Sequence, residues 1–266
     1  MLTNYHTHTT YCDGESTPEE IVIQAIGNGF SAIGFSGHGY TPFDLRYCMK
    51  DTSGYREEIF RLKRKYGEKI QIYCGVEEDA FSFTNRADFD YSIGSSHYIC
   101  VNGNYYPIDS GPAYFQKCLE LFDGNAVRLA EAYYSAFTSY IARRKPDIVG
   151  HFDLITKYDE CGDPQFLHSP AYLDTAEKYM KKAAENDVIF EVNTGAIARG
   201  LRKTPYPHER LLYTLKEQDG KLILSSDSHS AETLHFHFSE TEALLRDIGF
   251  KAVYELYDGT FKKRFL

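Results

Sequence analysis

The stretch Met1-Leu-Thr-Asn-Tyr-His6-Thr-His8 decides the fold, because a strand-like run there ends in two histidines. Side chains alternate along an extended segment with a period of two, so His6 and His8 point to the same side and can bind one ion together. Asp227-Ser-His229 repeats this spacing much later in the sequence. Divalent ions such as Zn²⁺, Mn²⁺ and Fe²⁺ accept mixed imidazole and carboxylate ligands. The two motifs therefore predict one metal site that is built from distant parts of the chain.

Other strand-like runs also end in residues that can bind a metal ion. The runs at 32–36, 71–76, 91–94, 148–151 and 188–192 end at or lead into His38, Glu77, His97, His151 and Asn193, and the run at 222–225 leads into Asp227. In an α/β barrel the carboxyl ends of the parallel strands converge on one face. Seven such endings predict one shared site. A carboxylate such as Glu77 can bridge two ions about 3.5–4 Å apart.

Helix-like segments alternate with these runs. Thr17, Pro18 and Glu20 have the pattern of a capping box with proline in the first turn, so a helix is expected to begin at Pro18. Further helices are expected at 51–65, 115–122, 127–141, 170–183, 207–218 and 240–248. This βαβα order predicts an α/β fold with a parallel sheet. Because the seven strand ends share one rim, we expect a closed or nearly closed barrel in a single domain over residues 1–266. The loops at 39–53, 157–168 and 194–206 leave that rim and are expected to form the wall of its pocket.

Composition narrows the class of protein. The chain has 266 residues, of which 42% are hydrophobic, so it can bury a large core. It has no uncharged apolar run of about 20 residues, so no membrane span is expected. Its six cysteines lack a Cys-x-x-Cys pair, and its first residues lack the features of a signal peptide; both predict a cytoplasmic protein with reduced thiols. The net charge of −9 argues against a nucleic-acid partner, and we expect a monomer or homodimer.

Taken together, the motifs resemble the polymerase-and-histidinol-phosphatase (PHP) superfamily from residue 5 to about residue 230. The motifs that carry the resemblance are His6-Thr-His8, Ser36-Gly-His38, Gly75-Val-Glu77, Ser95-Ser-His97, Gly150-His151-Phe-Asp153, Glu191-Val-Asn193 and Ser226-Asp227-Ser-His229. Within the superfamily, the chain is most similar to the PHP-type histidinol-phosphate phosphatases. The length, the single domain, and Asn193-Thr-Gly-Ala-Ile-Ala-Arg199-Gly followed by Pro205-Tyr-Pro207 support that subfamily.

The resemblance implies a distorted (β/α)7 barrel with three divalent metal ions, which are Mn, Fe or Zn. It implies that the first ion is held by His6, His8, Glu77 and Asp227, the second by Glu77, His97 and His151, and the third by His38 and His229. Many relatives supply one more histidine to the third ion from the loop after the first strand. The candidate in this chain is Asp13, which is either a metal ligand or a turn residue before Gly14.

The implied activity is hydrolysis of a small phosphate monoester, L-histidinol phosphate, to L-histidinol and inorganic phosphate in histidine biosynthesis. Asp227, His229 and Arg199 are the expected catalytic residues. Arg199 suits a phosphate because a guanidinium donates to two oxygens at once. Arg202 is either a second phosphate contact or a surface arginine. Asn193 contacts the substrate, supports a metal ligand from behind, or binds a metal itself, although an amide is a poorer ligand than a carboxylate.

Three points stay open in the sequence. Asp153 either orients an imidazole or caps a turn. The substrate amine needs an acidic partner, for which the candidates are Glu78, Asp79 and Asp44. Ordinary loop or helix positions are expected for the histidines outside the motifs, which are His168, His208, His235 and His237.

Two other functions are compatible with the same motifs. One is a PHP phosphoesterase that acts on nucleotides or oligonucleotide ends. The other is a barrel without enzymatic activity that binds metal for stability or for docking a partner. The full set of ligand positions favours an enzyme over the second alternative.

Overall fold

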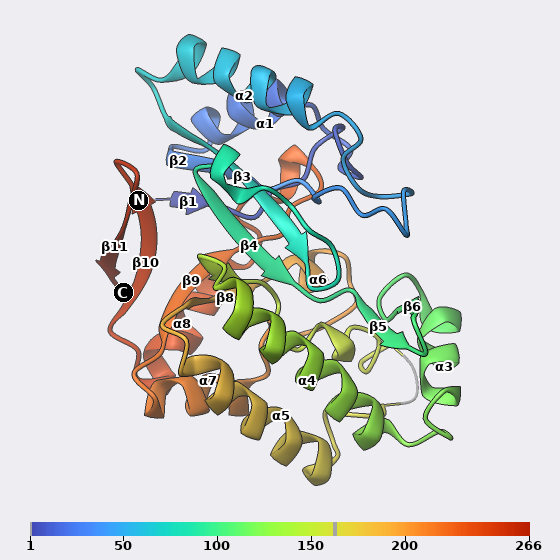
Figure 1. Ribbon diagram of the computed structural model, residues 1–266. Helices are drawn as coiled ribbons and strands as arrows, with labels where there is room; N and C mark the ends of the chain where they lie inside the picture. The colour runs from blue at the N-terminus through green and yellow to red at the C-terminus, as the bar shows by residue number, and fades with distance from the viewer. Residues whose placement is uncertain (1, 162–163) are drawn as a thin grey trace.

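Seven strands form the central sheet of the computed structural model, which describes residues 2–161 and 164–266 (Figure 1). Each strand pairs in parallel with the next. The order is β1 (Leu2–Asn4), β2 (Phe30–Phe35), β3 (Gln71–Asp79), β4 (Tyr91–Ser95), β7 (Ile148–Val149), β8 (Ile189–Asn193) and β9 (Lys221–Ser225). Just past the ends of β1 and β9, Thr7 and Ser228 form a parallel bridge. The sheet is therefore a nearly closed barrel, as the sequence predicts.

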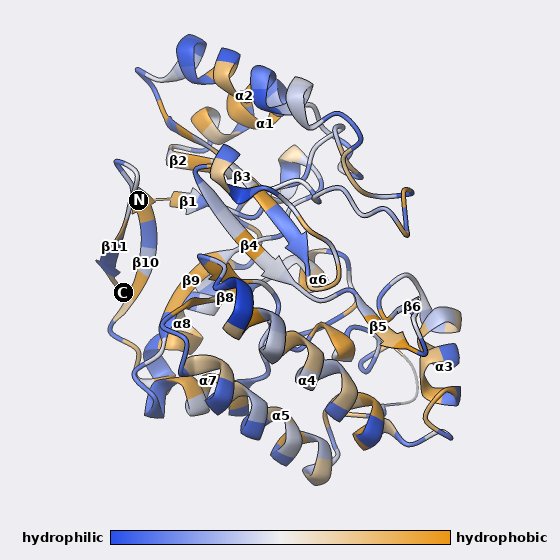
Figure 2. Ribbon diagram, viewed as in Figure 1, coloured by the Kyte–Doolittle hydropathy of each residue, from blue (hydrophilic) through white to orange (hydrophobic). Residues whose placement is uncertain are grey.

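Helices cover the outside of this barrel (Figure 1). They are α1 (Pro18–Gly27), α2 (Thr52–Tyr66), α3 (Pro112–Glu120), α4 (Ala126–Arg144), α5 (Pro170–Ala184), α6 (Gly195–Ala198), α7 (Glu209–Glu217) and α8 (Phe238–Ile248), with short 3-10 turns η1 (Arg86–Asp88), η2 (Leu154–Thr156) and η3 (Ala231–Thr233). Figure 2 shows that these helices mix hydrophobic and hydrophilic residues, as helices do that pack one face on a core. The expected capping box is present, since Thr17 Oγ1 accepts from the Glu20 backbone and Glu20 accepts from the Thr17 backbone.

A column of large side chains fills the inside of the barrel. Tyr5, Tyr91, Ile93 and Ile223 are buried there, and Leu256 of the C-terminal hairpin packs against the same cluster. The Tyr5 hydroxyl donates to the Leu256 carbonyl at 2.8 Å. The barrel is therefore a packed core, and the predicted metal-binding side chains lie at its carboxyl-end rim.

Two β-hairpins were not predicted. They are β5 (Tyr98–Val101) with β6 (Asn104–Pro107), and β10 (Ala252–Tyr257) with β11 (Thr260–Phe265). Their turns, Asn102-Gly103 and Asp258-Gly259, have positive φ at both residues. Asn-Gly and Asp-Gly are the pairs that such two-residue turns favour, so the sequence did carry the signal. The first hairpin lies beside the pocket, and the second packs near the amino end of the barrel.

The predicted helices and strands are present, with ends that differ by a few residues. The strand expected at 148–151 ends at Val149, and α6 occupies part of the loop expected at 194–206. Residues 162–163 of the loop expected at 157–168, and Met1 of the first run, lie outside the described residues. Among the described residues, no helix is long and apolar enough to cross a membrane. All six cysteines are free thiols.

Candidate metal centre

The first two predicted ligands follow β1 at the rim of the barrel. His6 and His8 are completely buried, and their ring centroids lie 5.1 Å apart. Neither Nε2 atom has a hydrogen-bond partner among the described residues. Buried polar atoms almost always have a partner, so two unpartnered imidazole nitrogens side by side indicate a group that binds there. Burial and the neighbouring His229 lower the pKa of His8 to about 3, which keeps its ring neutral and able to bind a cation.

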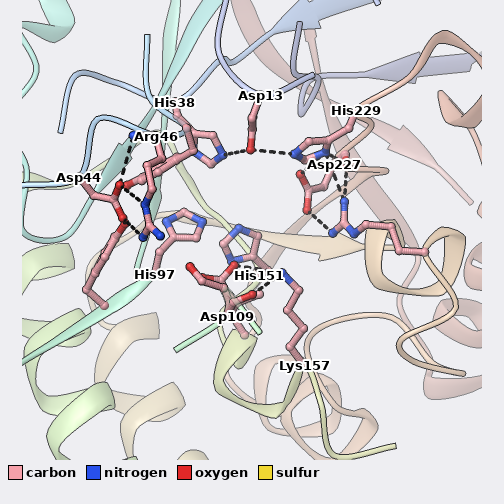
Figure 3. A pocket seen from close by; sticks show the side chains of 15 residues that line it. Asp13, His38, Asp44, Arg46, His97, Asp109, His151, Lys157, Asp227 and His229 are labelled. Atoms are coloured by element: carbon pink, nitrogen blue, oxygen red, sulfur yellow. Dashed lines mark hydrogen bonds and ion pairs between the residues drawn. The ribbon is translucent and has the colours of Figure 1, made fainter. Parts of the chain in front are cut away.

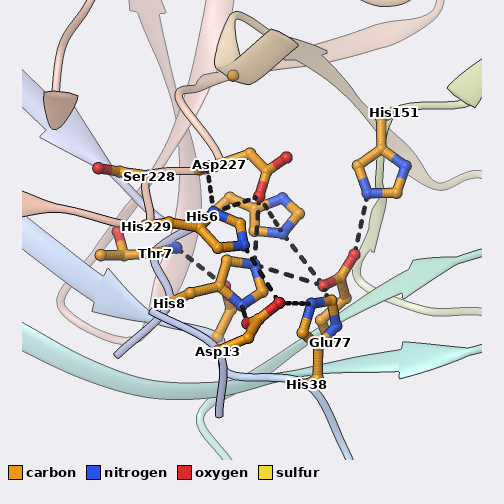
Figure 4. A network of polar contacts seen from close by, with 12 residues as sticks. His6, Thr7, His8, Asp13, His38, Glu77, His151, Asp227, Ser228 and His229 are labelled. Carbon is orange, nitrogen blue, oxygen red and sulfur yellow. Dashed lines mark hydrogen bonds and ion pairs between the residues drawn. The ribbon is translucent and has the colours of Figure 1, made fainter. Parts of the chain in front are cut away.

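Glu77, near the end of β3, lies at the centre of the cluster (Figure 4). Its Oε1 atom is 3.0 Å from Nε2 of His151, and its Oε2 atom is 2.9 Å from Nδ1 of His38 and 3.4 Å from Nε2 of His6. Only 1% of this residue is exposed. Burial alone would raise the pKa of Glu77, but the charges of His6 and His38 outweigh burial and hold it well below the usual value. The side chain of Glu77 is therefore an ionised carboxylate, and it is surrounded by histidines that follow several different strands.

Asp227 approaches the same cluster from the turn after β9. Its Oδ1 atom is 3.2 Å from Nε2 of His8 and 3.6 Å from Nε2 of His6. Its backbone has φ 47°, a left-handed conformation that is uncommon outside glycine and that costs free energy. On its other side, Oδ2 accepts from Nη2 of Arg199 at 3.0 Å. The strained turn thus places one carboxylate between the buried histidines and the arginine.

Asp13 lies in the loop after β1, as the sequence analysis expected. One of its oxygens is 3.6 Å from Nε2 of His38 and 3.6 Å from Nε2 of His229, and its other oxygen is 3.6 Å from Nδ1 of His8. The charge of His38, together with hydrogen bonds from His229 and His38, outweighs burial and lowers the pKa of Asp13. Asp13 therefore lies in an exposed turn, as one alternative expected, and its carboxylate also lies beside three histidines, as the other expected.

Four groups of donors could each hold an ion, because their ligand atoms lie within 4.8 Å of one another. They are His8, Asp13, His38 and His229; His6, Glu77 and His151; His6, His8 and Asp227; and His38, Glu77 and His97. Overlapping groups of imidazole and carboxylate donors are what a cluster of transition-metal or zinc ions requires. All nine residues predicted as ligands meet here, and the ion that each one binds stays a prediction.

A cavity of about 310 Å³ opens beside these donors (Figure 3). Its wall includes Asp13, His38, His97, His151, Arg199, Asp227 and His229, with Asp44, Arg46 and Tyr47 from the loop at 39–53 and Lys157 from the loop at 157–168. The expectation that the three loops wall the pocket is thus confirmed. Gly195 is needed here, since a Cβ would lie 2.7 Å from the Ser226 carbonyl oxygen and 3.0 Å from Arg199 Nη2.

Two predicted substrate contacts lie outside the wall of this cavity. The guanidinium of Arg202 is buried, donates to Thr156 Oγ1 at 2.6 Å, and lies 4.5 Å from the centre of the Tyr206 ring. It joins two loops behind the cavity, which corrects the expectation of a phosphate contact or a surface arginine. Asn193 is fully buried, and its amide donates to Glu191 at 2.9 Å. Asn193 thus bonds Glu191, which is not a predicted ligand but itself contacts the predicted ligands His6 and His151.

The acidic residues that the sequence left open lie in different surroundings. Glu78 points away from the rim and pairs with Arg144 at 2.7 Å. Asp79 accepts from the backbone of His97 at 2.8 Å, and Asp44 lines the cavity. Asp153 accepts from the backbone of His208 at 2.9 Å, and its side chain neither caps η2 nor bonds an imidazole.

Sequence reasoning assigned no position to three residues of this region, and it named a fourth, Asp79, only as a partner for the substrate amine. Asp109 and Lys157 line the cavity and form an ion pair at 3.0 Å. Glu191 and Asp79 each bond a histidine of the cluster. Glu191 stood within a motif and Asp79 directly follows Glu77-Glu78, so strand alternation alone would have placed both on the inner side with the ligands. No spacing marks Asp109 or Lys157.

The fold and these donors define a metal-binding α/β barrel with a substrate-sized cavity at its carboxyl-end rim. The PHP domain model matches residues 4–195, and the chain belongs to the PHP domain family.

Relatives that cover nearly the whole chain carry consistent names. A Schizosaccharomyces pombe protein named "Probable histidinol-phosphatase" is 30% identical over 268 residues, covering 91% of this chain and 85% of the relative. The "Histidinol-phosphatase" of Lactococcus lactis is 26% identical over 260 residues, covering 93% and 91%. A crystal structure of histidinol phosphate phosphatase from Lactococcus lactis, complexed with zinc, L-histidinol and phosphate, matches with a TM-score of 0.75 at 20% identity and covers 98% of both chains. At 20% identity, this structural likeness supports the fold alone.

Proposed function

We propose that this chain is a metal-dependent phosphatase that hydrolyses L-histidinol phosphate to L-histidinol and inorganic phosphate. The observation that carries the proposal is that nine candidate metal ligands meet beside one small cavity, and that six of them form its wall together with Arg199. The names of relatives that cover more than 90% of this chain support the choice of substrate. The enzyme would serve histidine biosynthesis.

The donor set fits divalent cations, for which we propose three ions of Mn, Fe or Zn. His6, His8, Glu77 and Asp227 would hold the first ion, Glu77, His97 and His151 the second, and Asp13, His38 and His229 the third. The unpartnered Nε2 atoms of His6 and His8 and the unpartnered Oε2 atom of Glu77 support this assignment. Bound cations of this kind neutralise phosphate oxygens and lower the pKa of water from 15.7 to about 7.

Arg199 is proposed to bind the phosphate of the substrate. Its Nη1 and Nη2 atoms donate to the backbone and side chain of Asp227 at 3.2 and 3.0 Å, which holds the guanidinium at the cavity wall. About a third of its side chain remains exposed, so donors are left for phosphate oxygens. Asp227 raises the pKa of Arg199 against the effect of burial, and the group stays charged.

Asp227 and His229 are proposed as catalytic residues beside Arg199. Asp227 and His229 both line the cavity, and Nδ1 of His229 lies 3.3 Å from Nη1 of Arg199. Burial alone would raise the pKa of Asp227, but Arg199 and His6 hold it well below its usual range, so Asp227 contributes an ionised carboxylate.

The far side of the cavity suits a small cationic alcohol. Asp44 and Asp109 line it and can face the amine of histidinol. Arg46 and Lys157 hold these carboxylates at 2.5 and 3.0 Å, so they stay ionised without a substrate. The Arg46 bonds lower the pKa of Asp44 to about 2.

The active domain is proposed to span residues 1–266, because Asp227 and His229 lie beyond the matched range of the family model. A cytoplasmic location is proposed on the six free thiols, which are typical of a reducing compartment.

A substrate panel tests the proposal. Purified protein with Mn²⁺ or Zn²⁺ is expected to release phosphate from L-histidinol phosphate much faster than from mononucleotides or 3′- and 5′-phosphorylated oligonucleotides. Preference for a nucleotide would replace the proposed substrate. Retained metal with no turnover of any monoester would favour a barrel without enzymatic activity.

A further inference from the structure

The buried carboxylate of Glu191, on β8, has no part in the function described so far. Glu191 is only 1% exposed, and its carboxylate lies at the rim beside the candidate metal-binding side chains. Oε1 accepts from Nδ1 of His6 at 2.6 Å. Oε2 accepts from the backbone N–H of His151 at 2.9 Å and from Nδ2 of Asn193 at 2.9 Å. Three strand ends are thus joined through one side chain.

We propose that Glu191 is a positioning residue that fixes the ring of His6 and the backbone of His151 in the geometry that holds two different metal ions. The proposal rests on the metal centre of the proposed function and does not depend on which phosphate ester is hydrolysed.

The bond to His6 decides which ring nitrogen can bind a cation. An ionised carboxylate only accepts hydrogen bonds, so Nδ1 of His6 must carry a proton. In the neutral ring, Nε2 then keeps its lone pair. This is the atom that faces Glu77 and Asp227 at 3.4 and 3.6 Å and has no hydrogen-bond partner among the described residues. Glu191 therefore selects the tautomer and the ring orientation that a metal site requires.

The second oxygen extends this effect to another strand. β8 pairs with β7. The backbone N–H of His151, which lies just past the end of β7, donates to Oε2 and is held in place by that bond. The ring of His151 faces the opposite oxygen of Glu77 from the one that faces His6. A shift of Glu191 would therefore disturb donors on both sides of the proposed bridging carboxylate.

Asp79 makes a similar but looser contact with another histidine. Its Oδ2 atom is 3.3 Å from Nδ1 of His97, which is longer than the 2.6 Å bond of Glu191. Because Glu191 has the shorter bond and joins two ligands, its removal should have the larger effect on metal binding.

Glu191→Gln tests the proposal with nearly unchanged side-chain size. The amide must either turn its NH₂ towards Nδ1 of His6, which favours the wrong tautomer, or turn it towards the donor N–H of His151. We expect the Zn²⁺ affinity, measured by competition with a chromophoric chelator, to fall about 10- to 100-fold. With metal at fixed low concentration, turnover of 4-nitrophenyl phosphate should fall in parallel and recover in part with excess metal.

Glu78→Gln is the matched control, because Glu78 is an equally buried carboxylate that pairs with Arg144 and contacts no ligand side chain. Both variants are expected to lower the melting temperature of the metal-free chain, but Glu78→Gln should keep the Zn²⁺ affinity within about threefold. Unchanged affinity in Glu191→Gln, or an equal loss in both variants, would overturn the proposal.

A measurement on the unmodified chain covers the case in which Glu191→Gln does not fold. NMR of the histidine ring nitrogens in the zinc-loaded chain is expected to show His6 protonated at Nδ1 and bound to metal at Nε2. Metal on Nδ1 of His6 would exclude the bond to Glu191 and overturn the proposal. Failure to hydrolyse L-histidinol phosphate would instead remove only the proposed substrate.

Discussion

At the scale of single residues, the candidate site depends on which buried donors lack an ordinary partner. His6, His8 and Glu77 are each at most 1% exposed, yet each has an atom without a hydrogen bond among the described residues. Leaving a buried polar atom unpaired costs about 1–3 kcal/mol, so such a group persists where a ligand satisfies it. The unpaired atoms face one another, which makes a shared group of cations the simplest physical explanation.

Glu77→Gln tests the shared ligand. An amide oxygen is a weaker ligand than a carboxylate and cannot bridge two ions with two charged oxygens, so turnover should be abolished. Metal content, measured by elemental analysis after dialysis, should fall by more than one ion per chain. A variant that keeps its full metal content and its activity would remove the bridging position of Glu77.

Arg199→Ala tests the phosphate contact. Loss of one charged donor to the reacting group should lower kcat/KM for L-histidinol phosphate by about 10²–10³-fold. Arg210→Ala is the control, because Arg210 pairs with Asp174 and Glu177 on the outer helices. A loss for Arg199→Ala no larger than the loss for Arg210→Ala would contradict the assigned contact.

At the scale of elements, the barrel strands were predictable because each ends in a polar ligand after an apolar run. Most of the nine proposed ligands were predictable for the same reason, whereas Asp13 in the loop after β1 was named from the family resemblance. The hairpins β5–β6 and β10–β11 were missed although Asn102-Gly103 and Asp258-Gly259 mark their turns. The position of Arg202 and the hydrogen-bond partners of Glu191 could not be derived, because they depend on contacts between strands and loops that are distant in sequence.

Leu256→Ala tests the contribution of the C-terminal hairpin. Leu256 is 2% exposed and packs against the side chains inside the barrel. Truncation leaves a cavity, so the free energy of unfolding should fall by about 2–5 kcal/mol in denaturant titrations. Metal content should stay unchanged, since the hairpin lies away from the rim. Unchanged stability would mean that the hairpin is not part of the core.

At the scale of the whole molecule, metal binding and barrel closure involve neighbouring residues. The bridge between Thr7 and Ser228 closes the sheet, and His6, His8, Asp227 and His229 flank that bridge directly. Ions held by these side chains would tie the first and last strands of the barrel together. A ligand that binds only the folded state adds to its stability, so removal of metal should lower the melting temperature.

The size of this metal effect should depend on pH. In the metal-free chain, burial opposes protonation of His6 and His38, but Glu191, Asp13 and Glu77 outweigh it and raise both pKa values well above 6.5. The protonated rings therefore stabilise the metal-free fold fully below pH 6.5, and this contribution is lost as pH rises through the raised pKa values. Metal must displace these protons.

The melting temperature should accordingly rise more on addition of Zn²⁺ at pH 8.5 than at pH 6.0. Thermal unfolding with and without metal at the two pH values measures the difference. A larger rise at pH 6.0 would show that His6 and His38 do not give up protons to the metal.

The central claim is that nine side chains from separate strands and loops surround a cluster of cations. A crystal structure of the chain with Mn²⁺, with anomalous scattering recorded, tests it most directly. We predict anomalous peaks at three positions between Glu77, Asp227, Asp13 and their histidines. Well-ordered side chains with no anomalous density among them would contradict it.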